Sequence, residues 1–261
     1  MCKPFTFIVL FVFFAARAMP AFAEGKPGSD EAAKQLFYKM EDRLSRATSL
    51  KCDLKIKVEG TGEPNGPFKK QELAGSLALA TPNLVRFELK KTAAEPSDLP
   101  GVHFWLTVSD GKRNLHEDSG TPKPLVHNAG KEEENALADY STLLARSGLY
   151  LVTLPLPPVA ARDMKDRFPV SEFKLGPKEK VGDVMAQRLD YRFDVKGQKQ
   201  PNGDDAPFQA SVWIDPKTSL PLKRAITWKF AGVQVISIDE RYENLVIDEK
   251  IDTATFKVPQ E

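Results

Sequence analysis

The stretch KCDLKIKVE, residues 51–59, decides the fold, because the spacing of apolar residues changes there from three or four positions to two. Every second residue there is apolar, namely Cys52, Leu54, Ile56 and Val58. Apolar residues that alternate with charged ones are typical of a β-strand with one apolar and one polar face. Residues 31–47, just before it, carry apolar side chains three or four positions apart. That spacing predicts one amphipathic helix ahead of a strand-rich body.

The period of two recurs along the rest of the chain. It predicts further strands over residues 77–79, 85–89, 102–108, 189–195, 210–214, 221–230 and 233–238, and a final extended segment over 243–258. Short polar turns such as Asp110-Gly111 and 215–218 connect neighbouring strands, which indicates an antiparallel meander. The expected fold class is therefore α+β, an antiparallel sheet with helices on one face.

Residues 131–168 interrupt the strands. A charged run is followed by helical spacing over 136–144, and 149–159 is largely apolar but contains three prolines. Proline excludes a central strand or a long helix there, and a short helix is expected over 160–167. We predict that the apolar part forms a lid or plug over the mouth of the sheet, an ordinary buried loop being the alternative. Its residues are Leu149, Tyr150, Leu151, Leu154 and Leu156.

Residues 1–23 have the features of a secretory signal peptide. Lys3 precedes an apolar run over residues 5–16, and Ala21-Phe22-Ala23 is a small-x-small cleavage site. The run of 12 residues is short for a membrane span, although an uncleaved anchor is the alternative. We expect residues 24–30 to be a flexible lead-in and residues 31–261 to form a single domain.

Charge and cysteine content narrow the class of protein. The formal net charge of +1 becomes −1 once Lys3 and Arg17 are removed, so there is no basic excess to indicate nucleic-acid binding. Only Cys52 is left after cleavage, so no internal disulfide forms and a core must hold the fold. Cys52 shares the apolar face of its strand, which favours a buried, inert thiol over a reactive one.

The sequence contains no recognised catalytic or cofactor-binding motif. The three histidines, His103, His116 and His127, lack metal-ligand spacing and are expected at strand ends or the surface. No phosphate-binding or dinucleotide loop and no nucleophile elbow occurs. We therefore expect no cofactor, no metal and no catalytic residue. Neighbouring acids such as Asp239-Glu240 are expected to be solvated, and a hydrolase with an unrecognised carboxylate pair stays an alternative.

Five motifs, in order, resemble the LolA-like family of periplasmic lipoprotein carriers and lipoprotein-sorting proteins. They are Ser49–Cys52 after the helix, Gly75–Leu89, Val108–Lys112, Trp213–Leu222 and Asp252–Pro259. One position departs from the pattern, since Thr81 precedes Pro82 where the family often has a basic residue. The resemblance implies a half-barrel, a strongly curved antiparallel sheet whose concave apolar side is covered by helices.

The resemblance also implies a function. We expect a monomeric, non-enzymatic carrier or chaperone in the periplasm, serving outer-membrane biogenesis. It would bind lipid or lipoprotein acyl chains and exchange them with membrane-bound donor and acceptor proteins. A sensor or regulatory protein-binding module on the same fold is the alternative. Twelve residues are candidates for the apolar cavity, although each could instead fill an ordinary core. They are Leu77, Leu79, Val85, Phe87, Leu89, Phe104, Leu106, Tyr191, Phe193, Trp213, Ile226 and Trp228.

Overall fold

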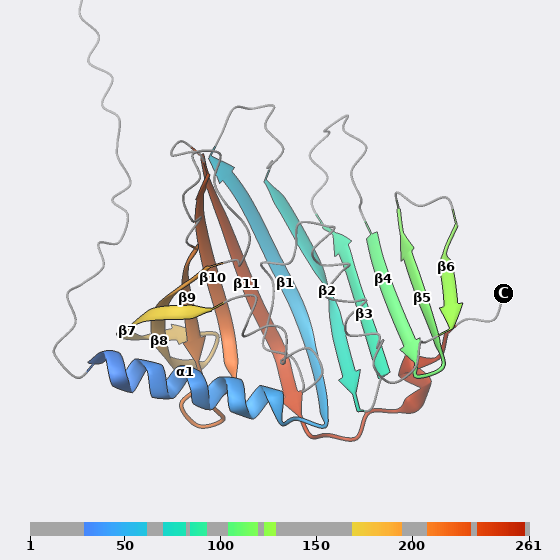
Figure 1. Ribbon diagram of the computed structural model, residues 1–261, viewed down its shortest axis with the longest axis horizontal. Helices are drawn as coiled ribbons and strands as arrows, with labels where there is room; N and C mark the ends of the chain where they lie inside the picture. The colour runs from blue at the N-terminus through green and yellow to red at the C-terminus, as the bar shows by residue number, and fades with distance from the viewer. Residues whose placement is uncertain are drawn as a thin grey trace, which may run out of the picture.

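The computed structural model describes most of the predicted strands and one helix (Figure 1). The described residues are 29–61, 70–81, 84–92, 104–119, 123–128, 169–194, 208–230 and 234–258. The predicted signal peptide, the insert 131–168 with its lid residues, and the polar residues 196–207 lie outside them.

Eleven strands in the described ranges form one antiparallel sheet. They are β1 Ser49–Thr61, β2 Gln71–Ala80, β3 Leu84–Lys91, β4 Phe104–Asp110, β5 Arg113–Asp118, β6 Leu125–Asn128, β7 Val170–Val181, β8 Val184–Phe193, β9 Phe208–Ile214, β10 Pro221–Phe230 and β11 Gln234–Ile247. Their order is β6-β5-β4-β3-β2-β1-β11-β10-β9-β8-β7. Two meanders therefore meet where the first strand pairs with the last, and the predicted antiparallel meander is confirmed.

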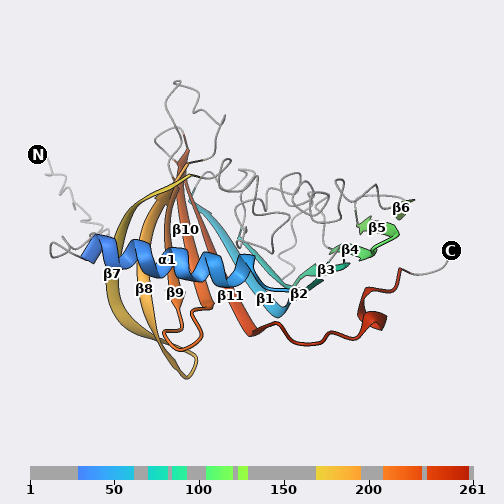
Figure 2. The same ribbon diagram turned by 60° about the horizontal axis from the view of Figure 1, so that its bottom comes forward.

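The predicted helix is confirmed as α1, Ser29–Ser45, and it crosses one face of the sheet (Figure 2). Ala33, Phe37, Met40 and Leu44 are buried, as their three- and four-residue spacing requires. The helix contacts β7 and β8 most extensively, where the Phe37 ring lies 4.8 Å from that of Tyr191. Within the described residues, no helix is both long enough and apolar enough to cross a membrane.

The side chains of β1, β2 and β3 alternate between the two faces of the sheet. The face that carries α1, called the inner face below, takes every second residue, for example Cys52, Leu77 and Phe87, which are adjacent in the strand register. Gly75 allows β2 and β3 to approach closely, since a Cβ atom there would lie 1.8 Å from the carbonyl oxygen of Glu88.

The end of the chain differs from the prediction. One long strand, β11, joins the segment expected over 233–238 to the first residues of the one expected over 243–258, and it ends at Ile247. After it, the Asp252 carboxylate accepts the Ala254 N–H at 2.9 Å and caps a 3₁₀ turn, Thr253–Phe256. This turn contacts β3 and β4 and brings the buried Val258 against Val108 and Leu115.

Candidate functional site

Nine of the twelve cavity candidates lie together on the inner face, in one cluster of buried side chains. They are Leu77, Leu79, Val85, Phe87, Leu89, Tyr191, Phe193, Ile226 and Trp228. Each has at most 7% of its surface exposed. The helix covers the β7 and β8 end of this face, whereas the apolar residues of β2 and β3 extend the face away from those strands (Figure 1).

The other three candidates lie on the opposite, outer face. Leu106 packs with Val108 and Leu115 in a second cluster, and the Phe104 ring lies 5.4 Å from the Lys90 ammonium. The register explains this, because Phe87 on the inner face is opposite Thr107, and a shift of one residue exchanges the faces. Trp105, which is not among the twelve candidates, is therefore an apolar inner-face residue of β4.

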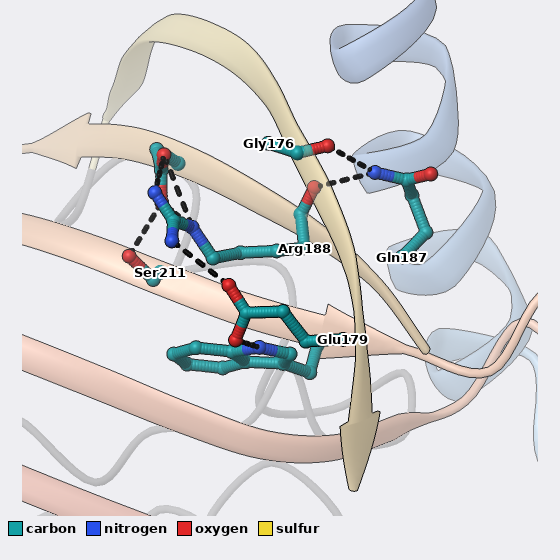
Figure 3. Close-up of polar contacts among 7 residues, drawn as sticks. Gly176, Glu179, Gln187, Arg188 and Ser211 are labelled. Carbon is teal, nitrogen blue, oxygen red and sulfur yellow. Dashed lines mark hydrogen bonds and ion pairs between the residues drawn. The ribbon is translucent and has the colours of Figure 1, made fainter. Parts of the chain in front are cut away.

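Trp213 lies on the outer face within a polar network that joins β7, β8 and β9 (Figure 3). Its indole N–H donates to Glu179 at 2.8 Å, and Arg188 donates to the same carboxylate at 3.0 Å. Arg188 also forms an ion pair with Asp190, which accepts a hydrogen bond from Ser211 at 2.5 Å. These contacts fix the bulged edge strand β7 to its neighbours, and give Trp213 a structural place away from the inner face.

A buried ion pair interrupts the apolar inner face. Arg224 and Glu240 are directly opposite in β10 and β11, and two hydrogen bonds of 2.7 and 3.2 Å join them. Tyr242 donates to the same carboxylate. Burial alone would lower the pKa of Arg224, but the Glu240 carboxylate raises it well above its usual value. The prediction that Glu240 is solvated is wrong, because its strand phase matches Ile238, which faces inward.

Polar side chains also occupy the inner face of β4 and β5. They are Thr107, Ser109, Asn114, His116 and Asp118, and the first three are buried. Nδ1 of His116 lies 3.4 Å from the Thr107 hydroxyl, and Nε2 lies 3.3 Å from the Asp118 carboxylate. His116 therefore links Thr107 of β4 to Asp118 of β5. It lies within its strand, and not at a strand end as expected.

The described residues contain neither a metal-binding cluster nor a reactive thiol. No group of three or more histidine, cysteine, aspartate or glutamate side chains there could hold a metal ion. The free Cys52 is buried on the inner face, and burial, with a smaller effect of Asp53, raises the pKa of its thiol to about 12. The thiol is therefore protonated at neutral pH and inert, as the sequence predicts.

The outer face carries a groove of about 510 Å³ that is lined mainly by charged residues. Lys55, Lys223, Asp239, Arg241 and Glu243 are among them. Lys55 pairs with Glu243 at 2.8 Å, and Lys223 pairs with Asp239 at 3.2 Å. A surface of paired charges suits polar contacts rather than acyl chains, so the apolar inner face is the candidate site for an apolar ligand.

Solved structures, including one of a LolA superfamily protein, match this chain over most of its length. That protein, from Nitrosomonas europaea, is 10% identical and aligns over 87% of this chain and 97% of its own, with a TM-score of 0.31. LprF from Mycobacterium bovis is 10% identical over 82% and 93% of the two chains, with a TM-score of 0.41. A DUF1329 family protein from Desulfovibrio piger is 12% identical over 88% and 97%, with a TM-score of 0.32.

No family model and no curated protein matches the chain. At identities of 10–12% and TM-scores of at most 0.41, the three matches carry no ligand and no residue role over to this chain. The function has to be argued from the residues of its own inner face.

Proposed function

We propose that this protein is an envelope carrier that binds the acyl chains of lipids or lipoproteins against its inner face. One observation carries the proposal. The cluster of nine candidate side chains continues across β2 and β3, away from the strands that α1 contacts most. A wide apolar sheet face that extends beyond its covering helix is the kind of surface that an acyl chain can share. The ordered sequence motifs support the same function.

Burial of the acyl chain alone can supply enough binding free energy at such a site, without a charged anchor. Each buried methylene contributes about 0.8 kcal/mol, so a sixteen-carbon chain contributes roughly 12 kcal/mol before the costs of association. The inner face of β1 to β3 supplies leucine, isoleucine, valine and phenylalanine side chains for that contact. The affinity then depends on how much of the acyl chain the protein encloses.

We propose further how the sheet, the insert and the N-terminal segment act in this function. The sheet would curl into a half-barrel around the acyl chain, and residues 149–156 would close the mouth as a lid. Residues 1–23 would direct the chain to the periplasm and be removed, leaving one domain over 31–261. Opening of the lid would let membrane-bound donor and acceptor proteins load and unload the ligand.

A regulatory protein-binding module is the second candidate function. It predicts an interior filled by the protein's own side chains, and the near-complete burial of inner-face residues such as Leu89 favours that interpretation. The two functions differ in one measurable property. A carrier exchanges its bound lipid, whereas a module with a filled core binds none.

Native mass spectrometry of the protein purified from a bacterial envelope tests the proposal. A carrier shows adducts with the mass of a lipid or lipopeptide, and after delipidation it takes up added palmitate in a defined ratio. The delipidated protein should keep its circular dichroism spectrum, which controls for unfolding. A folded protein that arrives without lipid and takes up no palmitate would overturn the carrier function and favour the regulatory module.

A further inference from the structure

We propose that the outer face of β11, β1, β2 and β3 binds a second copy of this chain through opposite charges that pair across a twofold axis. These four strands are neighbours in the sheet (Figure 1). The resemblance to lipoprotein carriers implies a monomer, so the proposal departs from that expectation. It concerns the outer face alone and does not depend on acyl binding to the inner face.

The outer-face side chains of these strands form two rows that run across the sheet. The basic row consists of successive partners in the strand register, namely Arg241, Lys55, Ala74 and Lys90. The acidic row consists in the same way of Glu243, Asp53, Ser76 and Glu88. Corresponding residues are two positions apart on each strand, so the rows lie about 7 Å from each other. The charges on this face are therefore arranged in stripes of one sign.

Striped charges are unfavourable for a single copy. Lys55 is directly opposite Arg241, and Asp53 is directly opposite Glu243. Like charges at directly opposite positions of neighbouring strands destabilise a sheet, whereas alternating signs along each row would avoid this. Rows of the opposite sign on a partner would compensate for both juxtapositions. The stripes therefore indicate a contact with a partner that carries matching rows.

Contacts within one copy do not neutralise every charge of the two rows. Lys55 pairs with Glu243 at 2.8 Å, which links one row to the other. Asp53 accepts a hydrogen bond at 2.7 Å from the amide of Asn244, which is neutral. Arg241 is exposed and lines the outer-face groove. Among the residues that the structure describes, neither Arg241 nor Asp53 forms an ion pair, so one charge in each row has no counter-charge.

A twofold axis that crosses the strands midway between the rows satisfies these charges. It places the basic row of each copy over the acidic row of the other and keeps every strand opposite the same strand. Arg241 then faces Glu243 of the second copy, and Lys55 faces its Asp53. The small side chains of β2 face one another and let the two sheets approach. Each ion pair forms twice, as an isologous dimer contact requires.

Charge balance distinguishes a second copy from a membrane surface. The two rows hold equal numbers of basic and acidic residues, so they lack the basic excess that attracts anionic lipids. Stripes of both signs instead fit a partner with the same stripes in reversed order, which this chain itself supplies. Ion pairs at an exposed surface are weak and screened by salt, so the dimer should be weak and salt-dependent. Both inner faces stay outside the contact.

Sedimentation equilibrium of charge-reversal variants tests the proposal. We expect the purified protein to dimerise at about 0.1–1 mM in about 20 mM salt, and to dissociate in about 500 mM salt. Arg241→Glu and Glu243→Arg each place like charges opposite one another at both symmetric contacts. Each variant alone should dimerise at least about tenfold more weakly. Circular dichroism shows whether the variants fold.

An equimolar mixture of the two variants restores the complementarity. Each reversed residue in a mixed dimer faces an opposite charge, so the mixture should dimerise about as tightly as the original chain. Lys217→Glu, in the exposed turn between β9 and β10, changes the net charge as much as Arg241→Glu and should have no effect. The pair Lys55→Glu and Asp53→Lys makes the same exchange on β1 and replaces the first pair if a variant of that pair does not fold.

The outcomes decide between this surface and the alternatives. A protein that stays monomeric at about 1 mM in low salt overturns the proposal and leaves the rows to solvent or to a different protein. A dimer that neither reversal weakens lies on another surface and also overturns it. A mixture of the two variants that stays monomeric refutes the twofold arrangement. Lipid uptake is measured separately, so each of these results leaves the carrier function standing.

Discussion

The buried pair of Arg224 and Glu240 allows a sharp test of how the inner face is held together. Replacing Arg224 with methionine leaves the Glu240 carboxylate, 0% exposed, with the Tyr242 hydroxyl but without its cation. Removing one partner of a buried pair destabilises by about 3–5 kcal/mol, because a charge stays buried without its counter-charge. For a domain of this size that corresponds to a melting temperature lower by about 6–20 °C.

The double variant Arg224→Met with Glu240→Leu removes both charges and refills the space with apolar atoms. We expect it to recover most of the stability lost in the single variant, because replacing a buried pair by apolar residues of similar size is often neutral or stabilising. Urea unfolding followed by tryptophan fluorescence and circular dichroism measures the free energies. The pair Lys55 and Glu243, with side chains 59% and 43% exposed, is the matched control on the outer face.

Exposed pairs contribute about 1 kcal/mol or less, so Lys55→Met should change the unfolding free energy little. Two results would refute the reasoning about the inner face. One is an Arg224→Met protein as stable as the Lys55→Met protein. The other is a double variant as unstable as the single variant, which would mean that the site needs its charges and not only their mutual compensation.

Three further predictions concern the described residues. Gly75→Ala should destabilise by about 1–3 kcal/mol in urea unfolding, because its Cβ would meet the Glu88 backbone, and an unchanged free energy of unfolding would contradict this. Cys52 should react with a thiol reagent at pH 8 only after unfolding, since burial raises its pKa to about 12, and rapid labelling of the folded protein would contradict this. Burial would raise the pKa of Asp110, but the backbone N–H groups of the following turn lower it. The stabilisation that Asp110 contributes is therefore present above the usual aspartate pKa and is lost as the pH falls. Asp110→Asn should flatten this acid dependence of the unfolding free energy.

Local patterns were sufficient for much of the fold. The helix over Ser29–Ser45 and the alternating strands could be predicted because each pattern lies within one element. The turn at Asp110 follows from its own side chain, which accepts the N–H groups of Lys112 and Arg113. The pairing of β1 with β11 was not predictable from such patterns, because it joins segments almost 190 residues apart.

The candidate site was predicted less completely, and the errors have physical causes. The sequence makes Trp213 a cavity candidate as an apolar strand residue, whereas the residues of β9 that face inward are Phe208, Ala210 and Val212. The sequence pattern does not predict β5, because its inner-face residues are polar and give no apolar alternation. The sequence predicts a solvated Glu240, because a charge next to Asp239 gives no sign of burial until the register places it opposite Arg224.

Photocrosslinking tests the central claim most directly. A palmitate analogue with a diazirine in its acyl chain would be bound to the purified protein, activated, and mapped by peptide mass spectrometry. The account predicts crosslinks on inner-face residues of β1 to β3, such as Leu77, Phe87 and Leu89, that unlabelled palmitate removes by competition. Crosslinks confined to the outer-face groove around Lys55 and Arg241, or none that competition removes, would contradict it.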